Sequence, residues 1–154
     1  MIDKNYLKKH LQKREELKAT IIRYNLLLSK EDISSPTGKS GFSSGGFLEF
    51  STVENIVCKK ILTEEKIKRL EKALAEQDTV INNVFEKLEK PYETMVMQMR
   101  YADGLEWDEI REGIFGSRKD YYEKIEKYTD KIFRIHGSAL KHIKELQTEE
   151  LVEE

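Results

Sequence analysis

Apolar residues recur every three to four positions along much of the chain, a spacing that predicts amphipathic helices. The first such stretch covers residues 3–30, where lysines and arginines fill much of the opposite face. Its apolar positions are Leu7, Leu11, Leu17, Ile21, Tyr24 and Leu28. Because no sustained period-2 pattern typical of strands interrupts the helical spacing, we predict an all-α protein.

A second long helix is predicted over residues 52–88. It should open at Ser51, because Ser51 and Glu54 have the spacing of a reciprocal capping pair. Farther on, its apolar positions are Ile67, Leu70, Leu74, Ile81, Val84 and Leu88. An apolar stripe of this kind is typical of a helix that packs against another helix, so residues 1–90 are predicted to form a long antiparallel helical hairpin or coiled coil. Residues 31–51, rich in serine and glycine, should form a long loop between the two helices.

The two helices of this hairpin differ in predicted length, about 42 Å against about 55 Å at 1.5 Å per residue. A simple hairpin would therefore leave Ile81, Val84 and Leu88 uncovered. Either the C-terminal part of the chain or a second subunit must pack there. A large apolar stripe is unusual on the surface of a monomer, so we expect a homodimer.

Pro91 marks the predicted start of a new module over residues 91–144, since proline disfavours a helical residue before it and suits a first helical turn. A helix over 91–102 should end at Asp103-Gly104, and a short helix should follow over 105–114. The inward face of the first helix is predicted to hold Tyr92, Met95, Met99 and Ala102, with Val96 beside them. The final helix should begin near Thr129, and an acidic tail over 145–154 is expected to be frayed.

The distribution of charge along the chain does not decide what the protein binds. The formal net charge is −2, distributed as +5 over residues 1–30, −2 over 31–90 and −5 over 91–154. Residues 91–144 alone are balanced, with ten basic against ten acidic side chains. Net charge therefore neither supports nor excludes a nucleic-acid partner, because what matters is whether basic groups share one face.

No arrangement of residues typical of catalysis is evident. Cys58 is the single cysteine, so an internal disulfide is excluded, and His136 and His142 are six residues apart, which does not suit a metal pair on one helix. We therefore expect neither an enzyme nor a bound metal or cofactor. No apolar run reaches the roughly 20 residues of a membrane span, and the N-terminus has no apolar signal core, so a cytoplasmic location without membrane contact is predicted.

The segments "MVMQMRYADGLEWDEI" and "FRIHGSALKHI" resemble the sigma-70 region 4 helix-turn-helix of small phage-encoded regulators, the ArpU/RinA type of late-gene activators. Specific residues match over about 91–143, whereas the N-terminal half agrees only in layout. The resemblance implies a phage or prophage transcriptional regulator that binds promoter DNA, with RNA polymerase as a possible protein partner. An insert over 115–128 replaces the tight turn of this motif, and we expect Phe115, Tyr121 and Tyr122 to pack it against the module.

In this motif the short second helix crosses the phosphate backbone and the third enters the major groove. The candidate DNA-binding residues are Arg111, Lys119, Thr129, Lys131, Arg134 and Lys141. Lys131 and Arg134 are suited to phosphate or guanine, and Arg111 and Lys119 should touch the backbone beside them. The outward positions of the last helix are predicted to be 130, 131, 134, 138 and 141, because Ile132, Phe133, Ile135, Ala139 and Leu140 would claim the buried face.

A second function stays open, in which the same module binds RNA polymerase or another protein rather than DNA. A continuous basic strip including Lys124 and Lys127 would favour DNA, and interruption by Glu123, Glu126 and Asp130 would favour a protein partner. Tyr92, Tyr101, Trp107, Met95 and Met99 are interpreted as core residues. Gly137 is expected to permit close approach of a neighbouring helix, since glycine within a helix costs about 1 kcal/mol relative to alanine.

Overall fold

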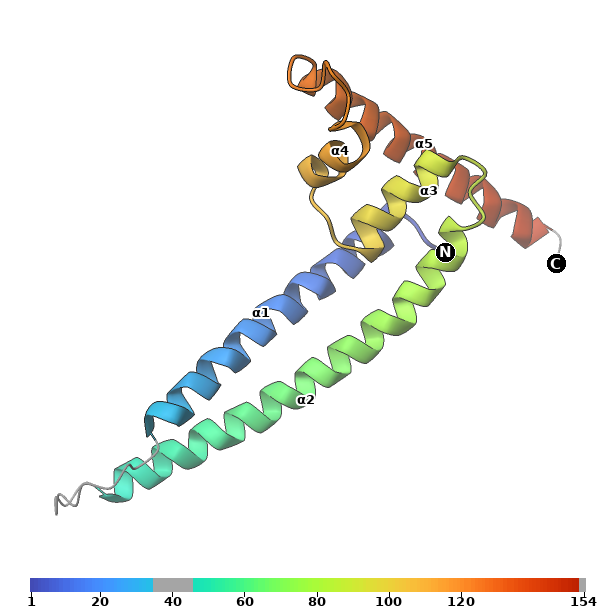
Figure 1. Ribbon diagram of the computed structural model, residues 1–154. Coiled ribbons are helices and arrows are strands. Elements are labelled where there is room, and N and C mark those ends of the chain that lie inside the picture. Colours follow the sequence, from blue (N-terminus) through green and yellow to red (C-terminus); the bar gives the residue numbers. More distant parts are fainter. Residues whose placement is uncertain (35–45, 153–154) are drawn as a thin grey trace. The chain divides into compact units, whose positions relative to one another are not determined.

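The computed structural model describes residues 1–34 and 46–152, with side chains described for 1–30 and 53–152, and over these ranges the chain is entirely helical apart from turns. The all-α prediction is confirmed. The elements are α1 (Lys4–Ser34), α2 (Gly46–Phe85), α3 (Pro91–Met97), η1 (Gln98–Ala102), α4 (Trp107–Phe115) and α5 (Ile125–Val152), shown in Figure 1. None of the described helices carries an apolar stretch long enough to span a bilayer.

Helices α1 and α2 pack antiparallel, as the sequence predicts. The connection between them is shorter than expected, because α1 continues to Ser34 and α2 begins at Gly46 rather than Ser51. Extending an existing helix costs little once its nucleus has formed, and residues 47–50 contain neither glycine nor proline. The rest of the predicted loop, residues 35–45, lies outside the described residues.

The chain divides into two compact units, and this division does not coincide with Pro91. The hairpin unit is Lys13–Ala73. The core unit combines Met1–Gln12 with Leu74–Glu154. Pro91 instead separates α2 from α3 within the core unit, where it stands at the start of α3.

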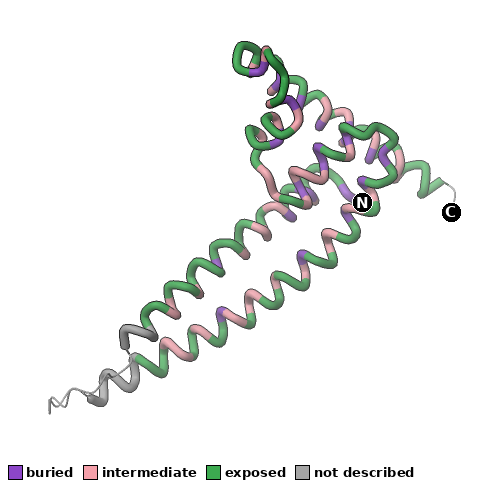
Figure 2. Tube along the Cα trace, viewed as in Figure 1, coloured by how far each residue is buried: buried purple, intermediate pink, exposed green. Residues whose placement is uncertain are grey.

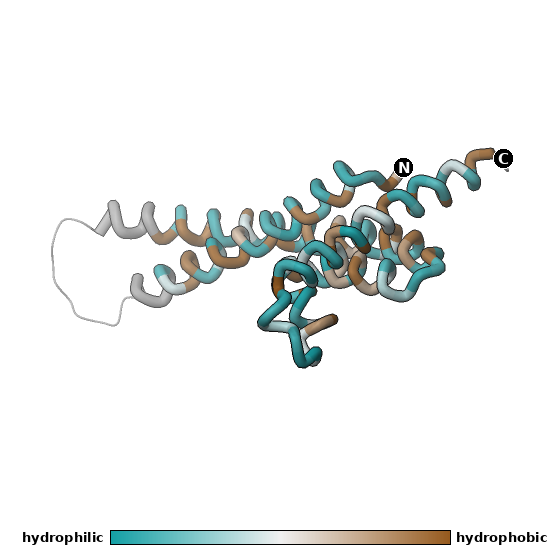
Figure 3. Tube along the Cα trace, turned by 90° about the horizontal axis from the view of Figure 1, so that it is seen from above, coloured by the Kyte–Doolittle hydropathy of each residue, from teal (hydrophilic) through white to brown (hydrophobic). Residues whose placement is uncertain are grey.

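The hairpin unit has almost no buried interior. Among its described side chains only Thr20 and Thr63 are buried, and each hydroxyl donates to a backbone carbonyl one turn earlier. An ion pair between Lys66 and Glu16, 2.8 Å apart, links the two helices. Figure 2 shows few buried positions along this part of α1 and α2, although apolar residues recur along both helices in Figure 3.

The core unit contains two apolar clusters. The first comprises Ile2, Leu7, Ile81, Phe85, Leu88, Met97, Tyr101, Ala139 and Ile143. The second comprises Val96, Ile110, Phe115, Tyr121, Tyr128 and Ile132. Together they join both ends of the chain to the end of α2.

These clusters remove one argument for a homodimer. Ile81 and Leu88, expected to lie uncovered, are buried in the first cluster, and Val84 packs against it. Residues from the C-terminal helices of the same chain supply the cover, which was one of the two possibilities open from the sequence. The homodimer itself stays a prediction.

Helix α3 turns a different face inward from the predicted one. Tyr92 and Met95 are exposed, whereas Val96, Met97 and Glu93 are buried. A polar contact accounts for this difference. The Glu93 carboxylate accepts a hydrogen bond from the Ser138 hydroxyl at 2.6 Å, which turns this side of α3 toward α5.

The acidic tail, expected to be frayed, is helical over its described part, since α5 extends to Val152. Its end is tied to the N-terminus: the backbone N–H of Ile2 donates to Gln147 Oε1 at 2.9 Å, and Gln147 Nε2 donates back to the Ile2 carbonyl at 3.2 Å. Lys87 also pairs with Glu150. These contacts offset the cost of ordering the last turns.

The expected reason for Gly137 is wrong. A Cβ placed on this residue would meet no atom within 4 Å, and the position is exposed. No neighbouring helix approaches it closely.

Candidate nucleic-acid interface

The turn before α4 is set by local chemistry. Gly104 has φ of 71°, a left-handed conformation that glycine adopts without steric cost, so Asp103-Gly104 ends the preceding helix as predicted. Glu106 and Glu109 then form a reciprocal capping box at the start of α4, with the Glu106 N–H donating to Glu109 at 2.7 Å. Arg100 completes the turn by donating to the Leu105 carbonyl at 2.8 Å.

Helix α4 is held against α5 by aromatic contacts. The Trp107 ring meets Phe133 and His136 edge-on, with centroids 5.2 and 4.9 Å apart. His136 is buried and hydrogen-bonded to the Tyr101 hydroxyl at 2.8 Å. Burial, with nearby Lys4 and Arg100, lowers the pKa of His136 to about 4, so the ring is neutral at pH 7. Phe133 was predicted to be buried but is 45% exposed, since Trp107 covers only part of it.

Arg111 does not face outward toward a phosphate backbone. Its Nε donates to the Tyr121 hydroxyl at 3.0 Å, one Nη donates to the Thr129 hydroxyl at 2.9 Å, and Asp108 pairs with it at 2.8 Å. The Tyr121 hydroxyl, more than any other contact, raises the pKa of Arg111. Five donors on one planar group allow this side chain to join α4, the following loop and α5. We therefore assign it a structural role.

Thr129 is part of the same network. Its hydroxyl accepts from Arg111 and donates to the Ile125 carbonyl at 2.9 Å, and the residue is only partly exposed. Both the donor and an acceptor site of this hydroxyl are thus engaged within the protein. The Thr129 side chain is therefore only partly available to an outside partner.

The segment 116–124, called here the α4–α5 loop, is fixed by its aromatic residues. Phe115 stacks on Tyr128 with ring centroids 4.9 Å apart, and Tyr121 also stacks on Tyr128, with centroids 6.0 Å apart. The Tyr128 hydroxyl donates to Asp120 at 2.6 Å, and Lys124 pairs with the same carboxylate at 3.0 Å. These two donors lower the pKa of Asp120 to about 2. Packing of the insert through Phe115 and Tyr121 agrees with the prediction.

Tyr122 departs from that prediction, because it is 80% exposed. Its only described ring neighbour is Tyr121, whose ring it meets edge-on with centroids 5.3 Å apart.

The remaining candidate cations do face solvent. Lys119, Lys131, Arg134 and Lys141 are all exposed. Lys131 carries its ammonium 5.4 Å from the centre of the Phe115 ring, and Lys141 lies 3.7 Å from Glu145. Lys127, Lys131 and Arg134 are four and three residues apart, so these exposed cations share one face of α5.

Arg118 belongs beside these cations and was missed from the sequence. Its guanidinium lies 5.6 Å from the centre of the Phe115 ring that Lys131 also approaches, so the loop and α5 each bring a positive charge to this ring. Residues 116–134 carry six basic against four acidic side chains. The signal available was the Arg118-Lys119 pair in the insert.

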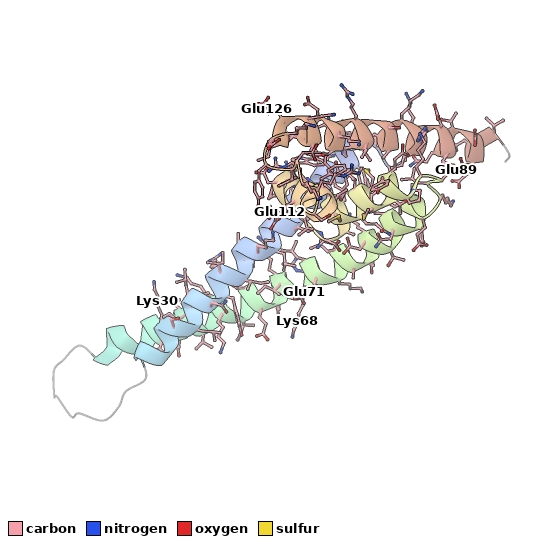
Figure 4. The ribbon with its side chains drawn as sticks, turned by 45° about the horizontal axis from the view of Figure 1, so that its top comes forward. Lys30, Lys68, Glu71, Glu89, Glu112 and Glu126 are labelled. Carbon is pink, nitrogen blue, oxygen red and sulfur yellow. The ribbon has the colours of Figure 1, made fainter. Side chains whose placement is uncertain are left out.

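Acidic residues interrupt this surface. Glu126 and Asp130 are exposed on the first turns of α5, and Glu126 extends from the start of the helix in Figure 4. The basic strip that would favour DNA and the acidic interruption that would favour a protein partner are therefore both present.

A polar cluster farther along α5 was also missed. Glu93 is buried and accepts from His142 Nδ1 at 2.7 Å as well as from Ser138, while Lys90 lies 3.7 Å away. Burial raises the pKa of Glu93, but the hydrogen bonds and positive neighbours outweigh it and the pKa is lowered. Ser138, predicted to point outward, is turned toward α3 by this contact.

A cavity of about 210 Å³ lies beside this cluster, lined by Lys87, Leu88, Glu89, Lys90, His142, Glu145, Leu146 and Glu149. Its charges are mixed in sign, and over the described residues no group of three His, Cys, Asp or Glu is arranged to hold a metal ion.

The chain matches no protein-family model, and no curated protein and no solved structure is significantly similar to it.

Proposed function

We propose that the protein is a DNA-binding transcriptional regulator, of the phage-encoded kind that the resemblance to sigma region 4 implies, and that the N-terminal half of α5 contacts duplex DNA. The observation that carries this proposal is the row of exposed cations Lys127, Lys131 and Arg134 on one helix face. Lysine and arginine on an exposed helix are the groups that neutralise phosphates and read guanine in the major groove.

The arrangement of α4 and α5 supports the same function. Because Arg111, Tyr121 and Tyr128 fix the α4–α5 loop, the first turns of α5 are held in a defined position relative to α4. A rigid support matters, since a recognition helix must present its side chains to base edges with little loss of entropy. The insert thus replaces the tight turn of the motif by packing.

The DNA contact set is narrower than the sequence indicated. Lys119, Lys131 and Arg134 remain its central members, and Lys127 is added. The side chains of Arg111 and Thr129 are instead hydrogen-bonded to other residues of the protein. Lys141 lies farther along α5 and close to Glu145, so its contribution should be smaller than that of Arg134.

A protein partner is the second candidate. Exposed Glu126 and Asp130, together with the 45% exposed Phe133, give this end of α5 a mixed surface of the kind found at protein interfaces. RNA polymerase is the partner that the resemblance suggests.

Fluorescence anisotropy with duplex DNA from upstream of neighbouring genes tests the proposal. The wild type should bind with an affinity that falls steeply as salt rises. Arg134→Ala should cost about 1–3 kcal/mol and relax specificity if Arg134 reads a base. Lys144→Ala, an exposed lysine more distant on the same helix, is the matched control and should change little.

Absence of salt-dependent binding by the wild type at about 10⁻⁴ M protein, the weak end of non-specific affinity, would contradict the proposal. The protein-partner function would then be favoured.

A further inference from the structure

The most exposed aromatic ring among the described residues of the core unit lies on the α4–α5 loop. Tyr122 is 80% exposed, whereas its neighbour Tyr121 is 4% exposed and receives a hydrogen bond from Arg111. One edge contact with Tyr121 leaves most of the Tyr122 ring in water. An aromatic ring with an apolar body and a polar tip, exposed on an ordered loop, is available for binding.

The loop that carries this ring also carries exposed cations, although the exposed Glu123 follows Tyr122 directly. Lys119 is exposed three residues before it, and Arg118 lies against the same Phe115 ring as Lys131 of α5. The nearby acid Asp120 is already paired with Lys124 and hydrogen-bonded to Tyr128. The loop therefore joins an exposed aromatic face to cations that continue onto the basic face of α5.

We infer that the α4–α5 loop is a second DNA-contacting element, in which Arg118 and Lys119 approach phosphates and the Tyr122 ring packs on a deoxyribose of the same duplex. Phosphates and sugars form the outer surface of a duplex, whose base faces are covered by stacking, so a loop beside the recognition helix meets the backbone first. This inference rests on the proposed DNA binding by α5. It extends that binding to a nonionic contact that the helix-turn-helix resemblance does not contain.

Because the Tyr122 contact is uncharged, its loss can be distinguished from the loss of a phosphate contact by the salt dependence of the affinity. Loss of a phosphate contact lowers the slope of log affinity against log salt by about one unit, whereas loss of an uncharged apolar contact leaves the slope unchanged. Tyr122→Ala should therefore weaken duplex binding about tenfold at every salt concentration, as expected when the apolar surface of one ring is no longer buried against the duplex. Tyr122→Phe keeps the ring and should bind like the wild type. Lys119→Ala should lower the slope.

Tyr92→Ala is the matched control. Tyr92 is also an exposed tyrosine of the core unit, at 52%, but it lies on α3 outside the loop. Its removal should leave affinity and slope unchanged. Trp107 fluorescence, which reports packing between α4 and α5, should be native in every variant used.

The outcomes separate the two proposals. If the wild type binds with salt dependence but Tyr122→Ala binds equally well, the loop contact is wrong and binding by α5 stands. If Tyr122→Ala and Tyr122→Phe lose affinity alike, the hydroxyl and not packing of the ring is responsible, which also overturns the inference. If the wild type does not bind duplex DNA at all, both proposals fall.

Discussion

The two compact units use the same helical spacing of apolar residues to very different effect. In the core unit this spacing yields fully buried side chains such as Leu7, Ile81 and Phe85. In the hairpin unit the described buried residues are two threonines, and Ile22, Leu26 and Leu62 are more than half exposed. An apolar face is buried only where enough other elements meet it, and two helices alone cannot cover each other's surface.

The comparison predicts unequal costs of mutation. Phe85→Ala removes a side chain with no exposed surface and should lower the free energy of unfolding by about 3–5 kcal/mol. Leu26→Ala in the hairpin unit, where the side chain is 60% exposed, should change it by no more than about 0.5 kcal/mol. Urea denaturation followed by far-UV circular dichroism measures loss of helix in both units, and the fluorescence of the single tryptophan, Trp107, measures the core unit alone. Equal effects of the two substitutions would show that the units do not differ in packing.

A second prediction concerns pH, and it applies to the core unit because all three histidines lie there. The pKa of His136 is lowered to about 4 in the folded protein from an ordinary value near 6.5, so the unfolded chain binds this proton more readily. The stability it contributes is complete above about pH 6.5 and is lost as pH falls toward 4, by about 3 kcal/mol in total.

Urea denaturation at several pH values checks this expectation. In His136→Gln the loss of stability between pH 6.5 and 4 should be smaller than in the wild type. An identical pH dependence in both proteins would mean that His136 is not the responsible group.

One substitution is predicted to raise the stability. Gly137 is exposed on α5 and a methyl group there would touch nothing within 4 Å. Gly137→Ala should therefore stabilise the core unit by up to about 1 kcal/mol, because alanine loses less backbone entropy in a helix. A lower denaturation midpoint in this variant would reveal a close contact at this position.

Periodicity was sufficient to predict the helices and much of the first apolar cluster, because Leu7 belongs to the apolar repeat of residues 3–30 and Ile81 and Leu88 belong to that of residues 52–88. It could not predict that Glu93 is buried, since a carboxylate enters a core only when distant donors such as Ser138 satisfy it. The role of Arg111 was likewise hidden, because its partners Tyr121 and Thr129 become neighbours only after the loop folds. For the candidate site, helical spacing identified the exposed Lys131 and Arg134 but not the exposed Tyr122.

Charge adds a contrast between the units that bears on function. The hairpin unit holds twelve basic against nine acidic residues, whereas the core unit is acidic overall, with fifteen against twenty. If net charge alone decided DNA binding, the hairpin unit would be the binding surface. The proposed function instead assigns binding to a local basic face within the acidic unit.

Hydrogen–deuterium exchange of the full chain, with and without duplex DNA at low salt, tests this assignment most directly. We expect DNA to slow exchange over residues 116–137, which include the α4–α5 loop and the first turns of α5, and to leave 13–30 and 53–73 unchanged. Slowing confined to the hairpin unit, or no slowing anywhere at about 10⁻⁴ M protein and DNA, would contradict the account.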